Sequence, residues 1–196
     1  MFPFKNIILA SASPRRKQLL EQIGVDFTVE ISGIDESIDL NLSPINLAKY
    51  FASEKAKKVA YKHPNQLVVG ADTIVAYDKK ILGKPKNEKD SYDMLTMLSG
   101  KTHKVITGVS IQYIDNDINI TFYESTKVTF NNLSKSYISY YIDTYKPYDK
   151  AGSYGIQDGF SVYIEKIKGC YYNVMGFPIS KFHYHYNTIL KSNFIC

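Results

Sequence analysis

A small set of charged side chains in this sequence has the composition that chemistry on a phosphate group requires. The set consists of two carboxylates, two lysines and two adjacent arginines: Glu36, Asp72, Lys55, Lys84, Arg15 and Arg16. Guanidinium and ammonium groups pair with phosphate oxygens, whereas carboxylates hold a hard divalent cation that usually keeps some of its waters. A cation lowers the pKa of bound water, and positive side chains stabilise charge on a leaving group. Phosphoryl chemistry with Mg²⁺ or Mn²⁺ would use both kinds of group.

Asp72 occupies the least ordinary position of the set. It lies within Leu67–Val75, a run that is apolar on both faces and therefore predicts a central strand. A lone buried charge is costly, so we expect Asp72 to have a partner or a metal ion. The alternative is a structural aspartate that accepts hydrogen bonds from a loop. Gly70, two residues earlier, predicts a close approach of backbone or ligand.

The arginines are the last two residues of the segment Asn6–Arg16, which reads as a strand, a hydroxyl-rich turn and the first turn of a helix. Ser13 is expected to cap the helix by accepting a backbone N–H bond. The free N–H groups of a helix start favour anions. Arg15 and Arg16 are locally unfavourable there unless an anion binds between them, and the hydroxyl of Ser11 adds a donor. The alternative is a capped surface helix with two solvated arginines.

The other charged candidates lie on a helix and on loops. Lys55 falls on or beside the apolar face of a helix predicted from Ser43 to about His63. Taken alone, this position favours a lysine whose stem covers the core while its ammonium reaches solvent. Glu36 lies in an acidic loop, and Lys84 lies in a short linker. The glycine-rich segment Gly152–Gln157 predicts a shaped loop, with a surface turn as the alternative.

The elements that must position these residues alternate between strands and helices, which predicts a mixed α/β fold. Expected strands cover residues 7–9, 26–31, 67–75, 105–113 and 119–130, with hairpins at 78–82 and across 161–167 and 171–174. Expected helices begin after Ser13, Ser43 and Ser134, another covers Glu88–Leu98, and a closing helix begins at Pro178.

Composition excludes several classes of function. The 196 residues fit one domain or two small lobes, and the net charge of +5 is too diffuse to indicate nucleic-acid binding. Two distant cysteines, Cys170 and Cys196, do not make a disulfide framework or a zinc site. No apolar run predicts a signal peptide or a membrane span, so the cytoplasm is the expected location. No Walker A or GxGxxG pattern occurs, which disfavours a P-loop NTPase and a dinucleotide dehydrogenase.

Six motifs, in this order along almost the whole chain, resemble the Maf family of house-cleaning nucleoside triphosphate pyrophosphatases. They are Ser-Ala-Ser-Pro-Arg-Arg at 11–16, Glu-Lys-Ala at 54–56, Gly-Ala-Asp-Thr at 70–73, Gly-Lys-Pro at 83–85, Asp-Lys-Ala-Gly-Ser-Tyr-Gly-Ile-Gln at 149–157 and Asn-Val-Met-Gly-Phe-Pro at 173–178. The resemblance implies an inosine-triphosphatase-like fold over residues 1–196, with a long curved mixed sheet and a cleft between two lobes. It also implies hydrolysis of a nucleoside triphosphate to the monophosphate and pyrophosphate.

The resemblance assigns roles to individual positions. Asp72 matches the family's proton acceptor, and Glu36 matches one of its phosphate- and metal-handling positions. We expect Glu36 and Asp72 to hold a divalent cation, Mg²⁺ or Mn²⁺. The remaining phosphate-handling and substrate-binding candidates are Ser11, Ser13, Arg15, Arg16, Lys55 and Lys84.

Three positions indicate which nucleotide base the resemblance implies. Arg15, Thr73 and Gln157 match the branch acting on dTTP and UTP, with modified pyrimidine nucleotides left open. The branch acting on 7-methyl-GTP carries a bulky aromatic residue, Gln and a Ser-Glu pair at these places. Asp158 departs from the family, which usually has glycine there.

The expected partner is therefore a nucleoside triphosphate, with no nucleic acid and no membrane, and a homodimer is left open. The alternative function from another class is a nucleotide-binding regulator of cell division, since the family was first associated with septum formation. Metal-dependent release of pyrophosphate discriminates between the two.

Overall fold

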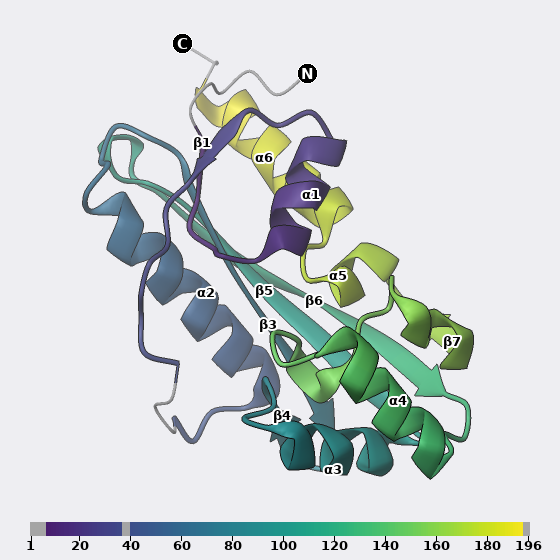
Figure 1. Cartoon of the computed structure of the whole chain (residues 1–196). Coiled ribbons are helices and arrows are strands. Elements are labelled where there is room, and N and C mark those ends of the chain that lie inside the picture. Colours follow the sequence, from purple (N-terminus) through teal and green to yellow (C-terminus); the bar gives the residue numbers. More distant parts are fainter. Residues whose placement is uncertain (1–6, 37–39, 194–196) are drawn as a thin grey trace. The chain divides into compact units, whose positions relative to one another are not determined.

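The computed structural model describes residues 7–36 and 40–193, which form the expected mixed α/β fold with a seven-stranded mixed sheet and helices packed on it (Figure 1). The strand order is β2-β1-β3-β5-β6-β7, and β4 pairs with β3. The strands are β1 (Ile7–Leu9), β2 (Phe27–Val29), β3 (Val68–Tyr77), β4 (Lys80–Leu82), β5 (Thr102–Tyr113), β6 (Ile118–Phe130) and β7 (Ile164–Lys168). The helices are α1 (Pro14–Gln22), α2 (Pro44–Ala60), α3 (Glu88–Leu98), α4 (Lys135–Tyr145), α5 (Tyr171–Met175) and α6 (Ile179–Asn193).

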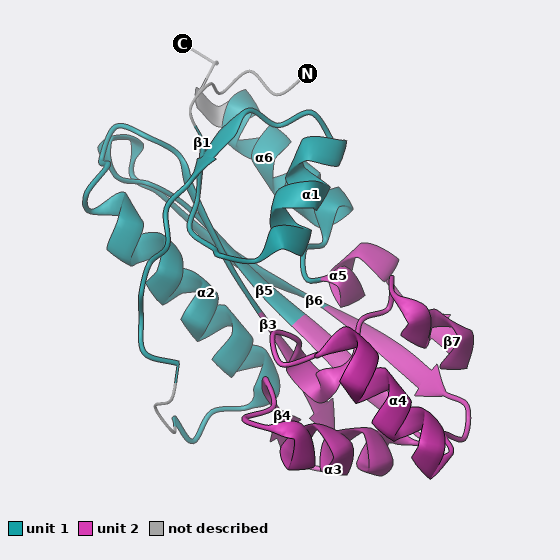
Figure 2. Ribbon diagram, in the orientation of Figure 1, with its two compact units in different colours: residues 1–72, 107–124, 176–196 teal, residues 73–106, 125–175 magenta. Residues whose placement is uncertain are grey.

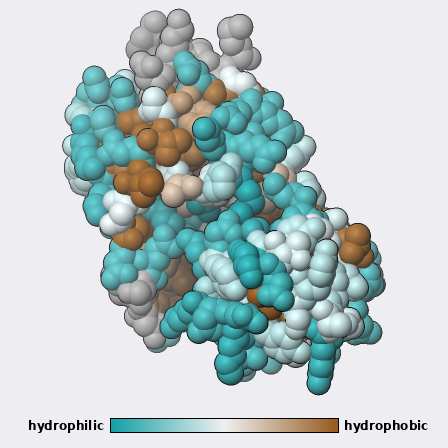
Figure 3. All heavy atoms as spheres, viewed as in Figure 1, coloured by the Kyte–Doolittle hydropathy of each residue, from teal (hydrophilic) through white to brown (hydrophobic). Residues whose placement is uncertain are grey.

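The chain divides into two compact units (Figure 2). Unit 1 comprises residues 1–72, 107–124 and 176–196, and unit 2 comprises residues 73–106 and 125–175. The boundary falls inside β3, β5 and β6. On the face shown in Figure 3 most residues are hydrophilic, and hydrophobic residues are scattered among them.

Unit 1 is built on parallel strands covered by a long helix. β1 pairs in parallel with both β2 and β3, with Ile8 opposite Thr28 and Val68. Two glycines let the backbone of α2 lie directly on the strands. A Cβ at Gly70 would meet the backbone nitrogen of Ala56 at 2.6 Å, and one at Gly108 would meet the backbone carbonyl of Ala48. This close approach sets the height of the α2 side chains above β3.

Unit 2 has an aromatic core. Phe130, Tyr154 and Phe160 are buried and contact one another, with ring centroids between 4.7 and 5.3 Å apart. Tyr141 of α4 packs edge-on against Phe160, with centroids 5.0 Å apart. A short hairpin joins β3 to β4 through Asp78 and Lys79, both with positive φ.

Most of the predicted boundaries are confirmed to within a few residues. Ser43 and Ser134 accept backbone N–H bonds at the starts of α2 and α4. Ser13 occupies the N-cap position of α1 as predicted, but its side chain makes no capping hydrogen bond. In the described part of the chain no helix is both long and apolar enough to cross a membrane.

The prediction of a hairpin across residues 161–174 is wrong. Residues Gly159–Tyr163 form a 3₁₀ turn, β7 pairs antiparallel with β6, and the expected second strand is helix α5. The side chain of Asn173 is fully buried and donates to the Val105 carbonyl at 3.0 Å and to Thr126 Oγ1 at 2.9 Å. These distant contacts select the local conformation over strand propensity.

Candidate active site

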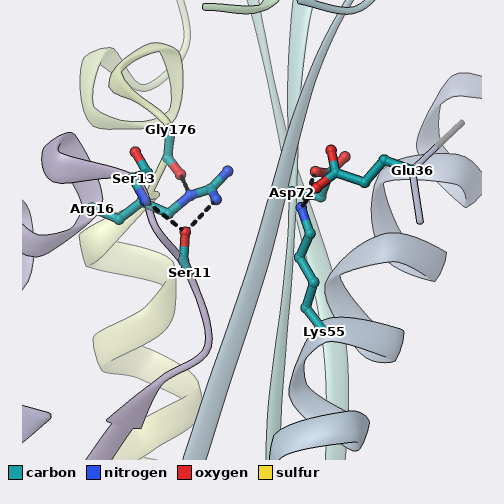
Figure 4. Close-up of polar contacts among 7 residues, drawn as sticks. All are labelled: Ser11, Ser13, Arg16, Glu36, Lys55, Asp72 and Gly176. Carbon is teal, nitrogen blue, oxygen red and sulfur yellow. Dashed lines mark hydrogen bonds and ion pairs between the residues drawn. The ribbon is translucent and has the colours of Figure 1, made fainter. Parts of the chain in front are cut away.

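The site in unit 1 centres on a buried ion pair (Figure 4). Asp72 lies on β3 with 6% of its surface exposed, and the Lys55 ammonium of α2 donates to its Oδ1 at 2.7 Å. The same ammonium lies 2.9 Å from Oε1 of Glu36, which belongs to the loop before α2. The helical spacing of α2 and its close contact at Gly70 bring Lys55 to this position.

The interpretation of Lys55 as a lysine that covers the core and reaches solvent is therefore wrong. Its side chain is only 8% exposed, and its charge is used inside the protein. Helical periodicity indicates the face on which a residue lies, but it carries no information about the strand opposite. The expectation that Asp72 has a partner is fulfilled by Lys55.

Burial raises the pKa of Asp72, because the ionised form loses hydration. The charges of Lys55 and Arg16 oppose this shift, and the nearby carboxylate of Glu36 adds to it. A carboxylate with a raised pKa is a stronger proton acceptor once it is ionised. Asp72 thus combines a fixed position with increased basicity.

The turn that precedes α1 is organised by Arg16 and not by a serine cap. Arg16 is 8% exposed; its Nη1 donates to Ser11 Oγ at 2.8 Å and its Nε donates to the carbonyl of Gly176 at 2.9 Å. The backbone N–H of Ser13 donates to the same Ser11 Oγ at 3.3 Å. The alternative of two solvated arginines is therefore wrong for Arg16, whereas Arg15 is half-buried.

In Figure 4 the guanidinium of Arg16 points in the direction of Asp72. Their charges interact: Asp72 opposes the lowering of the Arg16 pKa that burial causes. The structure therefore brings Ser11, Arg16, Glu36, Lys55 and Asp72 into one polar region of unit 1.

Three further candidates belong to unit 2: Thr73, Lys84 and Gln157. The backbone N–H of Gly152 donates to the carbonyl of Gly83 at 3.0 Å, which joins the glycine loop to the linker that carries Lys84. A Cβ at Gly152 would meet Cγ2 of Val75 at 2.8 Å, so the loop lies directly on β3. Thr73 shares the face of β3 that carries Val75, because side chains alternate along a strand. Lys84 and Gln157 are exposed.

Sequence reasoning missed the residues that hold this loop. Ser153 adopts a φ of 65° and is fully buried, and its hydroxyl is hydrogen-bonded to that of Ser91 on α3. The spacing of Ser91 with Met94, Leu95 and Leu98 on one helix face indicates that it is buried. Tyr141 likewise shares the buried face of α4 with Ile138 and Ile142, but no sequence signal indicates its bonds to the loop.

The carboxylates also bear on metal binding. Among the described residues, no group of three or more His, Cys, Asp and Glu side chains is arranged to hold an ion. Asp72 and Glu36 nevertheless supply two hard oxygen donors around one position, which the Lys55 ammonium now contacts. Mg²⁺ is commonly held by one or two carboxylates together with waters and substrate phosphates. This donor set fits such an ion when it arrives with a triphosphate.

Comparison with known proteins gives concordant matches. The model of the family described as "Maf-like protein" matches residues 6–188. A protein of Bacillus mycoides named "dTTP/UTP pyrophosphatase" is 50% identical over 177 residues, which cover 90% of this chain and 92% of the relative. A Bacillus cereus protein of the same name is also 50% identical, with 90% of this chain and 86% of the relative covered.

Among solved structures, the Ham1 protein of Staphylococcus aureus matches with a TM-score of 0.44 and 17% identity, over 64% of this chain and 72% of that chain. The family match spans nearly the whole chain, and the relatives are half identical over nine-tenths of it. The chain belongs to the family of Maf-like proteins.

Proposed function

We propose that this protein is a dTTP/UTP pyrophosphatase, which hydrolyses the nucleoside triphosphate to the monophosphate and pyrophosphate. The observation that carries the proposal is the buried carboxylate of Asp72, fixed by Lys55 on a central strand and facing the Arg16 region. The proposal is supported by the name of relatives that are half identical to this chain.

In the proposed reaction, water attacks the α-phosphorus while Asp72 accepts its proton. The bond between the α-phosphorus and the bridging oxygen breaks, and pyrophosphate leaves with the bonding electrons. Lys55, Lys84 and Arg15 stabilise the negative charge that develops on the leaving group. A divalent cation held by Glu36 and Asp72 would neutralise phosphate charge and lower the pKa of bound water.

Base selection is assigned to residues outside the ion pair. Arg15 lies at the start of α1, Thr73 lies beside Asp72 in β3, and Gln157 lies on the glycine loop. A pocket that must hydrogen-bond a pyrimidine needs such fixed polar groups, because a substrate that leaves them unpaired is strongly disfavoured. We also propose that both units act as one catalytic domain of residues 1–196.

A panel of nucleoside triphosphates, assayed for pyrophosphate with Mg²⁺ and with Mn²⁺, tests the proposed function. We expect dTTP and UTP to be turned over faster than the purine nucleotides, with pyrophosphate as the product. Tight nucleotide binding without any pyrophosphate would contradict the proposal and favour a nucleotide-binding regulator of cell division.

Removal of divalent cations is expected to abolish turnover. Two carboxylates beside a triphosphate repel it electrostatically, and a cation reverses that repulsion. The measurement is pyrophosphate release after exhaustive chelation and again after Mg²⁺ or Mn²⁺ is restored. Turnover that persists in the chelated protein would contradict a metal role for Glu36 and Asp72.

Arg15→Ala is expected to lower kcat/KM by about tenfold to a hundredfold, because one charge-assisted phosphate contact is worth roughly 1.5–3 kcal/mol. Arg15 is half-buried at the first turn of α1, where a phosphate would also meet free backbone N–H groups. Lys17→Ala is the matched control, since it removes an exposed cation from the same helix. Equal kcat/KM values for the two variants would show that Arg15 does not contribute to substrate binding.

A further inference from the structure

The glycine loop, residues Gly152–Asp158, is fastened to α4 by one tyrosine. The Tyr141 hydroxyl lies 3.1 and 3.0 Å from the two carboxylate oxygens of Asp158, to which it donates. The same hydroxyl accepts the backbone N–H of Gly155 at 3.0 Å. One side chain therefore bonds to two places on the loop, three residues apart.

The Asp158 carboxylate also binds the backbone that follows the loop. Its Oδ1 accepts the backbone N–H of Phe160 at 3.0 Å, which begins the following 3₁₀ turn. A Cβ added at Gly155 would collide with the Asp158 carboxylate, so the carboxylate lies directly against the loop backbone. Burial and the negative charge of Asp158 raise the pKa of Tyr141, which keeps the hydroxyl protonated as the donor.

The first half of the loop is held independently. Ser153 is fully buried and bonded to Ser91 of α3, and Ile156 is 5% exposed. Gln157 is the exposed residue of this segment, and it lies between the packed Ile156 and the bonded Asp158. The backbone on both sides of Gln157 is thus fixed, while Gln157 itself is exposed.

We propose that Asp158 and Tyr141 form a positioning pair that presents Gln157 to the base of the nucleotide. The inference rests on the proposed function, because it assigns a task to the loop within the pyrimidine site. Neither Asp158 nor Tyr141 needs to touch the substrate. Fixing a polar side chain before binding removes an ordering cost that substrate binding would otherwise meet.

The first test is Tyr141→Phe, which removes one hydroxyl and keeps the aromatic ring in the core. We expect KM for dTTP and UTP to rise about tenfold, as for loss of a charge-assisted hydrogen bond, with kcat changed less than twofold. The preference for dTTP and UTP over purine nucleotides should fall in the same variant. Tyr140→Phe, a hydroxyl removal at a 58% exposed position of the same helix, should change neither constant.

Two variants of Asp158 separate positioning from folding. Asp158→Asn keeps an oxygen that can accept from Phe160 and Tyr141, and we expect it to retain most of the wild-type base preference. Asp158→Ala removes all of these bonds and should reproduce the Tyr141→Phe phenotype. Equal kinetic constants in Asp158→Ala and the wild-type protein would overturn the inference.

The decisive comparison is a double-mutant cycle between Tyr141→Phe and Gln157→Ala. If Tyr141 acts through Gln157, the double variant should have the KM of Gln157→Ala alone. A purely structural role would instead add the two losses, and that result would overturn the inference. Wild-type protein without pyrophosphate release would contradict the proposed function, whereas active wild-type protein with additive losses contradicts only the positioning pair.

Hydrogen exchange gives a readout that does not depend on turnover. In Tyr141→Phe the amides of residues 155–158 should exchange at least about tenfold faster than in Tyr140→Phe, because the closed loop lacks the bonds of the hydroxyl to Gly155 and Asp158 and opens more readily. Equal protection in the two variants would mean that the hydroxyl does not fix the loop, and would overturn the inference.

Discussion

Asp72→Asn is expected to lower turnover by at least about a hundredfold, the low end of general-base effects. Asparagine keeps the size and most of the hydrogen bonding of aspartate, but it cannot accept a proton from the attacking water. The carboxylate is held by Lys55 at 2.7 Å and lies on a central strand, so we expect the asparagine side chain to occupy the same position.

The same substitution should leave thermal stability nearly unchanged or slightly higher. Burial makes the ionised form of Asp72 costly, which is the physical content of its raised pKa, and asparagine removes that cost. The loss of the ionic bond to Lys55 offsets this gain, but the Lys55 ammonium keeps its ion pair with Glu36 at 2.9 Å and is not left uncompensated, unlike Asp72 when Lys55 is removed. The measurements are kcat and the midpoint of thermal unfolding, with the exposed Asp93→Asn as the matched control. A kcat near the wild-type value would contradict the role of Asp72 and would indicate Glu36 as the proton acceptor.

Lys55→Met is expected to lower the free energy of unfolding by about 3–5 kcal/mol, as when one partner of a buried ion pair is removed. Methionine fills a similar volume but leaves Asp72 ionised and buried, with the Glu36 carboxylate nearby. Lys57→Met on the same helix is the matched control, since Lys57 is exposed. The measurement is denaturant unfolding of both variants and of the wild-type protein.

The pH dependence of this loss has a definite sign. The folded-state pKa of Asp72 is raised above its unfolded value, so the cost of the ionised carboxylate is present above the folded pKa. That cost disappears as the pH falls through the folded pKa and a proton binds. The stability difference between Lys55→Met and the wild-type protein should therefore narrow toward acid pH. A difference that widens there, or one below about 1 kcal/mol as for an exposed ion pair, would contradict the buried pair as its origin.

The elements of the fold could be predicted because their signals are local. The apolar run around Asp72 marks a central strand, and Ser43 and Ser134 mark helix starts that the structure confirms. Helix α5 could not be predicted in this way, because Asn173 acquires its conformation from Val105 and Thr126, each more than forty residues away. Local propensity has no access to such bonds.

The candidate site, like the fold, could be predicted only where its signals are local in the sequence. A carboxylate within an apolar strand implies a partner, and that reasoning was correct for Asp72 without naming Lys55. The position of Lys55 on its helix favoured a solvated lysine instead, because an amphipathic pattern cannot distinguish a solvated ammonium from one that contacts a buried charge. Ser13 has the right type for a cap, yet the polar centre of that turn is Arg16, whose partner Gly176 is 160 residues away.

The final Ser192–Cys196 tail had no interpretation from the sequence, and residues 194–196 lie outside the described part of the chain. Asp158, which the resemblance in sequence marked as a departure, makes side-chain bonds to Tyr141 and Phe160. A glycine at this position could make neither side-chain bond. The aspartate at position 158 thus contributes bonds that hold the loop that carries Gln157.

The most direct test of the central claim is single-turnover hydrolysis of dTTP in water labelled with heavy oxygen, with the products analysed by mass spectrometry. Attack on the α-phosphorus, with Asp72 as proton acceptor, places the label in the nucleoside monophosphate and leaves pyrophosphate unlabelled. Label in pyrophosphate, or release of orthophosphate in its place, would contradict the account.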